Sequence, residues 1–191
     1  MGKVFVNITM SLDGFVAGPN ISEANPLGEG GERLHDWMFK DRTEADNSIA
    51  EEMNARGGAI ILGRRTYADA IDRAWGGETP FQAPAFVLAK NAPVKVADGF
   101  TFVTDGIESA LKQARTTAGE KDIWLMGGAN VIQQYIKAGL VDEIQVSIAP
   151  VLFVKGTRLF EHIGTDSIEL QSNRVIQTPQ ATHIRYNIIK S

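Results

Sequence analysis

Residues 122–136 constrain the fold of this chain most strongly, because they combine three structural signals in a fixed order. Four apolar residues, 123–126, precede the pair Gly127-Gly128, and a short apolar run that ends at glycine is typical of a buried strand. The apolar residues after the glycine pair recur at helical spacing, namely Val131, Ile132, Tyr135 and Ile136. The sequence therefore predicts a strand, a turn without side chains, and a helix.

This order suits a phosphate group, because the first turn of a helix offers unpaired N–H groups and the helix dipole favours an anion. The full G-x-G-x-x-G pattern is missing, so the alternative is that Gly127 and Gly128 only let the strand and the helix pack closely. A second junction of the same kind follows the apolar run 59–62 and consists of Gly63, Arg64, Arg65 and Thr66. Arginine binds phosphate bidentately, although both arginines are alternatively solvated surface charges. Two such junctions favour a shared anionic ligand.

The composition is that of one globular domain, residues 1–191, with 43% hydrophobic and 22% charged residues. A formal net charge of −4 argues against nucleic acid as the main partner, because phosphate-backbone binding needs a basic face. The chain has no cysteine, so it has no disulfide or thiolate metal site, and we expect no metal. No apolar run approaches the roughly 20 residues of a membrane span. We therefore expect a cytoplasmic protein without a membrane partner.

Runs rich in apolar and β-branched residues alternate with helical patterns along the chain. The strand-like runs are 4–10, 59–62, 84–89, 100–103, 123–126 and 141–152. Helical patterns run from the start at residues 43–46 to Arg56, from Tyr67 to about Ala74, and from the start at residues 105–108 to Ala118. Segments 168–177 and 182–189 flank a short turn and are typical of an antiparallel hairpin. This order predicts an α/β sheet that is parallel in the middle and antiparallel at one edge, with ligands at its carboxyl edge.

Two helix starts have the spacing of a capping box, Thr43 with Asp46 and Asp105 with Glu108. Asp46 also lies on the same helical stripe as Ile49. A carboxylate there either caps the helix by accepting backbone N–H bonds, or lines a pocket as a proton donor whose pKa is raised by desolvation. The spacing alone favours the cap.

Residues 21–42 are irregular and rich in glycine, which is typical of a lid or binding loop in a compact domain. Residues 32–39 alternatively form a short helix that buries Leu34, Trp37 and Met38, and the two interpretations are compatible. As a lid, this segment would bring His35, Trp37 and Phe39 to stack on a ligand.

Five segments occur in the order and spacing of the dihydrofolate reductase superfamily: SLDGFVAG (11–18), LGRRTY (62–67), MGGA (126–129), VDEI (141–144) and GTRLF (156–160). More narrowly, the chain resembles the branch shared with the reductase domain of the riboflavin-biosynthesis bifunctional deaminase-reductase. The resemblance covers nearly the whole chain. It implies a mainly parallel eight-stranded sheet flanked by helices, with NADPH bound across its carboxyl edge.

The resemblance also assigns cofactor contacts to four segments. Residues 127–131 match a pyrophosphate-binding turn, 63–66 a second phosphate-binding turn, 89–91 the loop beside the adenosine 2′-phosphate, and 16–17 the loop beside the nicotinamide carboxamide. The implied cofactor-binding residues are Val16, Ala17, Gly63, Arg64, Arg65, Thr66, Ala89, Lys90, Asn91, Gly127, Gly128, Ala129, Asn130 and Val131.

Asp46 lies about where dihydrofolate reductases keep their single pocket carboxylate, so the resemblance implies a catalytic role in protonating the acceptor. Ser147 matches a strand hydroxyl that supports pterin binding. Asn7 and Trp37 are the other substrate-binding candidates.

Two departures from the resemblance bear on the substrate. Residues 81–84 lack the arginine with which dihydrofolate reductases hold the folate tail, and Met126 stands where riboflavin-pathway reductases usually have glutamate. We therefore expect an NADPH-dependent reductase of a small heterocyclic or pterin-like compound, with weak dihydrofolate reduction. The alternative is a non-catalytic nucleotide-binding protein that retains the reductase fold. The sequence does not fix the oligomeric state, and a homodimer is one possibility.

Overall fold

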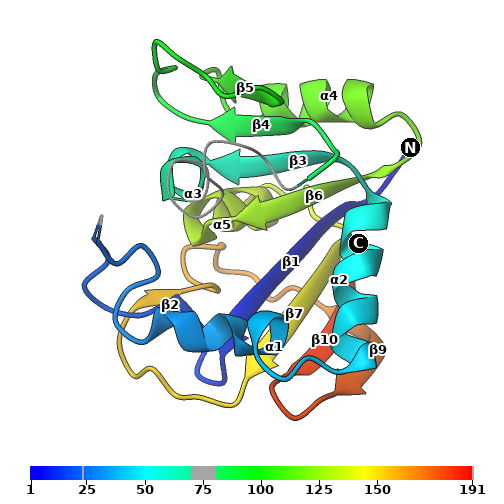
Figure 1. Cartoon of the computed structure of the whole chain (residues 1–191). Coiled ribbons are helices and arrows are strands. Elements are labelled where there is room, and N and C mark those ends of the chain that lie inside the picture. The colour runs from blue at the N-terminus through cyan, green and yellow to red at the C-terminus, as the bar shows by residue number, and fades with distance from the viewer. Residues whose placement is uncertain (23, 70–80, 191) are drawn as a thin grey trace.

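The computed structural model describes residues 1–22, 24–69 and 81–190, and its centre is one eight-stranded sheet (Figure 1). The strands of this sheet are β1 (Val4–Ser11), β3 (Gly57–Gly63), β4 (Ala85–Leu88), β5 (Phe100–Val103), β6 (Asp122–Gly127), β7 (Glu143–Ala149), β9 (Leu170–Gln177) and β10 (Thr182–Ile188). Their order across the sheet is β5-β4-β3-β6-β1-β7-β10-β9. The six strands from β5 to β7 in this order are parallel to one another, whereas β10 is antiparallel to both β7 and β9.

Helices cover both faces of the parallel part. On one face, α4 (Ile107–Ala118) and α5 (Ala129–Lys137) pack on a core that includes Val4 and Val6 of β1. The other face is covered by α2 (Glu44–Arg56) (Figure 1). Its Met53 belongs to one core cluster with Phe5 and Trp124. Because successive side chains of a strand point to opposite faces, β1 contributes to both cores and is apolar over most of its length.

A second, two-stranded sheet pairs β2 (Phe15–Ala17) with β8 (Thr157–Arg158). It follows the turn after β1 and lies near the carboxyl ends of the parallel strands (Figure 1). The short helix α3 (Arg64–Asp69) follows β3 directly at the same edge.

The predicted architecture is confirmed: a mainly parallel eight-stranded sheet flanked by helices, with an antiparallel C-terminal hairpin at one edge. The strand expected over 141–152 is shorter, because it ends at Ala149 before Pro150, which has no N–H to donate to a ladder. The helix expected from Tyr67 to about Ala74 is present as α3 to Asp69, and its remaining residues lie outside the described part of the chain.

One of the two expected capping boxes is confirmed and the other is wrong. Thr43 and Asp46 exchange both capping hydrogen bonds at the start of α2. Helix α4 instead has Gly106 as its N-cap, with φ of 105° and no side-chain cap. Asp105 therefore lies one residue before the cap, where its side chain cannot serve as one.

The segment expected as a lid or a short helix forms η1 (Gly31–His35), a 3-10 helix, followed by α1 (Asp36–Phe39). Leu34 and Trp37 are fully buried and Met38 is partly buried, as the short-helix interpretation predicts. Phe39 is exposed.

Candidate functional site

Two glycine turns meet at the carboxyl edge of the sheet, where β3 and β6 end side by side. Leu62 of β3 is paired with Gly127 of β6, so Gly63 lies next to the Gly127-Gly128 turn. A Cβ atom built on Gly63 would lie 3.1 Å from Cγ2 of Val131 and 3.9 Å from the nitrogen of Gly128. The close approach of these two backbones joins the two segments for which the sequence predicted a shared ligand.

The turn after β3 places a hydroxyl and a guanidinium group beside the glycine pair. A Cβ atom built on Gly128 would lie 3.6 Å from Oγ1 of Thr66 and 4.0 Å from Nη2 of Arg65. Nη1 of Arg64 donates to the carbonyl oxygen of Asn91 at 3.5 Å, which brings the loop after β4 to the same edge. The exposed members of this group are Arg64, Arg65, Lys90 and Asn91.

Helix α5 begins at this edge with its N-terminus uncapped by any side chain. Its N-cap residue is Gly128, and no acidic side chain lies in its first turn. Ala129 and Val131 are buried in the core, whereas Asn130 is exposed. The N–H groups of Val131 and Ile132 donate to the carbonyl oxygen of Gly128 at 3.0 and 3.3 Å. The N–H groups before Val131 and the positive end of the helix dipole are therefore what this helix start offers an anion beside Arg65.

Val16 and Ala17 belong to β2, which is supported by the same helix. Ala17 is paired with Thr157 of β8. Immediately after this pair, Nε2 of Gln133 on α5 donates to the carbonyl oxygens of residues 158 and 159, both at 3.1 Å. The expected nicotinamide loop and the expected pyrophosphate turn thus rest on one helix.

Asp13 fixes the turn between β1 and β2, although the sequence pattern did not single it out. Its Oδ1 accepts hydrogen bonds from Oγ of Ser11 at 2.6 Å and from the nitrogen of Phe153 at 3.1 Å, and its Oδ2 accepts one from the nitrogen of Val154 at 2.8 Å. Burial raises the pKa of Asp13, but these bonds outweigh it and lower the pKa to about 2. The available signal was the Asp-Gly pair, which is typical of a tight turn.

Asp46 is fully buried, and both of its carboxylate oxygens are occupied. Oδ2 accepts the backbone N–H of Thr43 at 2.9 Å and its hydroxyl at 2.7 Å, while Oδ1 lies 3.0 Å from Nε2 of His183. Burial raises the pKa of Asp46, but the hydrogen bonds from Thr43 and His183 hold it below its usual value. Of the two interpretations of Asp46, the favoured helix cap is confirmed. The raised pKa of the alternative is not found, because a carboxylate with several donors is stabilised in its charged form.

His183 connects Asp46 to Ser147 beneath α2. Oγ of Ser147 lies 2.8 Å from Nδ1 of His183, and both residues are almost completely buried. Burial lowers the pKa of His183, and the nearby carboxylate of Asp46 opposes this only in part. A single histidine within an alternating strand gave no signal of this role, because its partners lie far away in the sequence.

The other expected substrate residues lie on the same face of the sheet but are also buried. Nε1 of Trp37 donates to Oγ1 of Thr9 at 2.9 Å, and the Trp37 ring meets the His183 ring edge-on with centroids 4.8 Å apart. The carbonyl of Asn7 accepts a hydrogen bond from Nε1 of Trp124 at 3.4 Å. Trp37 is therefore a core residue, 2% exposed, and does not offer its face to a ligand.

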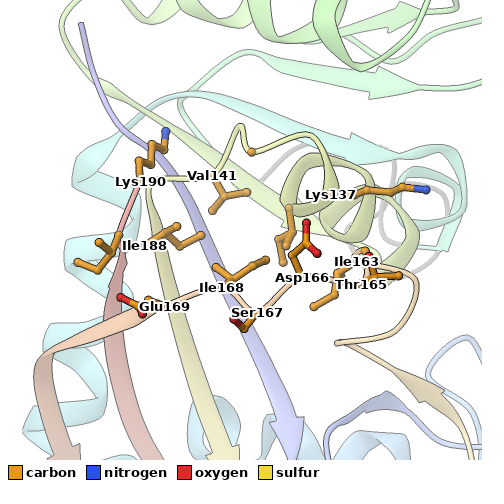
Figure 2. Close-up of a pocket in the computed structure, with 14 residues that line it drawn as sticks. Lys137, Val141, Ile163, Thr165, Asp166, Ser167, Ile168, Glu169, Ile188 and Lys190 are labelled. Carbon is orange, nitrogen blue, oxygen red and sulfur yellow. The ribbon is translucent and has the colours of Figure 1, made fainter.

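Two cavities lie elsewhere on the molecule. One of about 700 Å³ lies between the end of α5, the segment 163–169 and the end of β10, and Figure 2 shows Lys137 and Lys190 on opposite sides of it. A second, of about 360 Å³, lies between α2 and residues 81–83, with Trp124 in its wall. Neither is lined by the residues of the glycine turns.

Within residues 1–22, 24–69 and 81–190, no group of three or more metal-ligating side chains of the His, Asp and Glu type could hold a metal ion. Among the helices of these residues, none has the length and hydropathy to cross a membrane.

The fold and its carboxyl edge define the class of protein, which is an α/β domain of dihydrofolate reductase type. This edge has two glycine turns and the exposed cations Arg64, Arg65 and Lys90. Within that class, the chain belongs to the RibD C-terminal domain family, whose model matches residues 2–184. It is 25% identical over 185 residues to YwjB, an uncharacterized protein of Bacillus subtilis (strain 168), covering 96% of this chain and 97% of that protein.

Solved structures share the fold at lower identity. A Shewanella sp. PV-4 protein named for riboflavin biosynthesis superposes with a TM-score of 0.74 at 19% identity, over 98% of this chain and 99% of that chain. Dihydrofolate reductase from Enterococcus faecalis, solved in complex with NADP(H), superposes with a TM-score of 0.62 at 18% identity, over 99% and 98% of the two chains. The resemblance inferred from the sequence is thereby confirmed.

Proposed function

We propose that this protein is an NADPH-dependent reductase of a small heterocyclic or pterin-like compound. The observation that carries the proposal is the convergence of the two glycine turns, with Gly63 packed on Val131 and Arg65 and Thr66 beside Gly128. Backbone N–H groups, a hydroxyl and guanidinium groups suit the phosphates of a dinucleotide. The family relationship and the NADP(H) bound to the enterococcal reductase of the same fold support this choice.

The chain's own residues would bind and orient the reactants in this proposal. The turn 127–128, Arg65 and Thr66 would hold the pyrophosphate, and β2 would hold the nicotinamide near the end of β1. The bound cofactor supplies the hydride for an acceptor C=N or C=O group. Asp46 has no solvent contact and its pKa is lowered, so we assign it no proton transfer, and the proton that completes the reduction would come from water.

The cofactor preference provides the test of this proposal. Arg64, Arg65 and Lys90 supply more positive charge than a pyrophosphate alone requires, which favours a 2′-phosphate. We expect NADPH to bind at least about 10-fold more tightly than NADH, equivalent to about 1.4 kcal/mol. The measurement is titration calorimetry of each cofactor with the wild type, Arg65→Ala and Lys90→Ala.

Each variant should narrow the preference for NADPH. Lys121→Ala is the matched control, because Lys121 is an exposed cation at the amino end of β6, opposite the glycine turns. Equal affinity of the wild type for both cofactors, or an equal effect of Lys121→Ala, would contradict the assignment.

A non-catalytic nucleotide-binding protein with the same fold is the second candidate. The observation that favours it is Asp46, because the one candidate acid is buried and engaged on both oxygens. Steady-state oxidation of NADPH separates the two functions. A protein that binds NADPH tightly but oxidises it with no ketone, imine or dihydropterin acceptor would belong to the second class.

A further inference from the structure

The cavity of about 700 Å³ at the end of α5 has the volume of a small-molecule site and an apolar floor. The floor consists of side chains of the hydrophobic core. Ile136 is 4% exposed, Val141 is 1% exposed, and Ile188 packs against the same cluster. Ile168, which also lines the cavity, is 37% exposed. An apolar group bound here would therefore rest on the core and cover an apolar side chain that now meets water.

The segment 163–169 forms one wall of this cavity and is anchored at both ends. Ile163 packs against the main core cluster, and the carbonyl oxygen of Glu169 accepts a hydrogen bond from the N–H of Ile189 at 3.0 Å. Between these anchors, Gly164 has a φ of 117°, which glycine adopts without strain. The wall is therefore preformed in the free protein.

The charged groups around the cavity favour a positive ligand. Figure 2 shows the carboxylate of Asp166 turned toward the middle of the cavity, whereas the amine groups of Lys137 and Lys190 point away from it. Nζ of Lys190 is already paired with a carboxylate oxygen of Asp142. Within the described part of the chain, the Asp166 side chain has no ion pair or hydrogen bond. Glu169 adds a second carboxylate to the lining.

Helix α5 adds to the same preference. It ends at Lys137, so the negative end of its dipole lies beside the cavity. The cavity thus combines an apolar floor with an unpaired carboxylate and a negative helix end.

We propose that this cavity is a binding site for a small amphipathic cation, which carries an ammonium group on an apolar chain or ring. The apolar part would lie on Ile136, Val141 and Ile188, and the ammonium group would bind the carboxylate of Asp166. Because residues of the glycine turns do not line this cavity, the site is additional to the proposed cofactor site and independent of the reductase function.

Three probes of one chain length test the preference for a cation, namely n-hexylammonium, n-hexanol and n-hexanoate. Amide chemical shifts of the wild-type protein, followed by NMR without NADPH, report affinity and place together. We expect a Kd of about 1 mM for hexylammonium, which is a reasonable affinity for so small a ligand. Hexanoate should bind at least about 10-fold more weakly, because Asp166 and Glu169 repel it.

The amide resonances that move with hexylammonium should be those of residues 163–169, whereas those of residues 127–131 should stay in place. Equal affinity for hexylammonium and hexanoate, or shifts confined to residues outside the cavity, would overturn the proposal.

Two variants separate the contribution of the carboxylate from that of the apolar lining. Asp166→Asn should weaken hexylammonium binding at least about fivefold and leave hexanol binding unchanged, because only the charge is removed. Ile168→Ser should weaken all three probes alike, because it removes apolar contact area. Ile168 lies before β9, so this change does not alter the sheet.

Asp98→Asn is the matched control for the charge, because Asp98 is an exposed aspartate that lines neither cavity. It should change the affinity for none of the probes. Undiminished hexylammonium binding by Asp166→Asn, or an equal loss in Asp98→Asn, would overturn the proposal.

Discussion

Asp46 illustrates which part of a site is encoded locally. Its bonds to Thr43 span three residues, so the capping spacing predicted them, and the structure confirms both. Its bond to His183 spans 137 residues, and no sequence pattern indicates such a contact. That distant bond helps to set the charge state, which is why desolvation alone predicted the wrong direction for the pKa. The hydrogen bonds of Asp13 to residues 153 and 154 span 140 and 141 residues, so the sequence pattern did not indicate them either.

Replacing Asp46 separates a structural role from a catalytic one. Asp46→Asn leaves the N-cap Thr43 in place and keeps one oxygen that can accept its backbone N–H, but it weakens the charge-assisted bond to His183. We expect a loss of stability of about 1–3 kcal/mol and a change in turnover below about threefold. Urea unfolding and NADPH oxidation with any working acceptor measure the two quantities. A loss of turnover of about 10²-fold would instead assign proton donation to Asp46.

Two histidines, the buried His183 and the half-buried His35, should make the protein sensitive to mild acid. Burial lowers the pKa of His183 and of His35 from the ordinary 6.5, although Asp46 opposes the shift at His183 and Asp36 opposes it at His35. As pH falls below about 6.5, the unfolded chain takes up these protons first, so stability declines from pH 6.5 towards pH 5. Each histidine contributes at most about 1.4 kcal/mol per pH unit.

Thermal unfolding at pH 7, 6 and 5 tests this titration. His183→Gln should flatten the fall in Tm, because glutamine can bridge polar groups without taking up a proton. His162→Asn is the control, because His162 is exposed and has a left-handed backbone that asparagine tolerates. A fall in Tm that is equal in both variants and the wild type would assign the acid sensitivity to other groups.

At the scale of elements, the segment 11–17 is held in place by hydrogen bonds to the loop at 150–154. Leu12 donates to the carbonyl of Val151, and Asp13 accepts from two further backbone N–H groups of that loop. This turn leads into Val16 and Ala17 of β2, which pairs with β8, and Gln133 of α5 donates a hydrogen bond to the carbonyl oxygen of Arg158 in β8. The periodicity of the sequence predicted the strand before this turn. It could not predict the bonds to the loop at 150–154, because the same periodicity extended the strand to residue 152, past its end at Ala149.

Asp13→Asn should loosen this segment without unfolding the sheet. An amide has only one acceptor oxygen, so it cannot hold the Ser11 hydroxyl and both backbone N–H groups at once. We expect faster amide exchange at residues 153 and 154 and at least about threefold weaker NADPH binding. Because the pKa of Asp13 is lowered to about 2, the wild type should lose the same hydrogen bonds only as pH falls from about 4 towards 2. Unchanged exchange at 153 and 154 would show that the backbone bonds alone suffice.

At the scale of the whole molecule, alternating strands and helices predicted a parallel sheet with an antiparallel edge. The glycine at the end of two strands predicted where a ligand edge would lie. The strand order was not deducible from periodicity, because β1 inserts between β6 and β7 through contacts of more than 100 residues in sequence separation. The resemblance to a known superfamily predicted eight mainly parallel strands without their order, and the structure confirms that number and direction.

Dihydrofolate should be a poor substrate, because two recognition groups that it needs are missing or engaged. Asp46 has no free oxygen for a pterin edge, and residues 81–84 (Phe-Gln-Ala-Pro) contain no cation for the glutamate tail. Losing one buried charged contact without replacement costs a few kcal/mol, or more than about 100-fold in affinity. We expect dihydrofolate kcat/KM at or below about 10⁴ M⁻¹s⁻¹, with higher values for small ketone or imine acceptors, which need neither a carboxylate for a pterin edge nor a cation for the tail.

Gln82 allows a direct test of the missing cation, because it lines the cavity of about 360 Å³ between α2 and residues 81–83. Gln82→Arg should raise kcat/KM for dihydrofolate several-fold by lowering KM, while leaving a tail-free dihydropterin unchanged. Gln82→Leu is the matched control of similar size without charge and should change neither value. The assay is NADPH oxidation followed at 340 nm with each acceptor. A wild-type kcat/KM for dihydrofolate near about 10⁶ M⁻¹s⁻¹ would show that neither group is needed and that the chain is itself a dihydrofolate reductase.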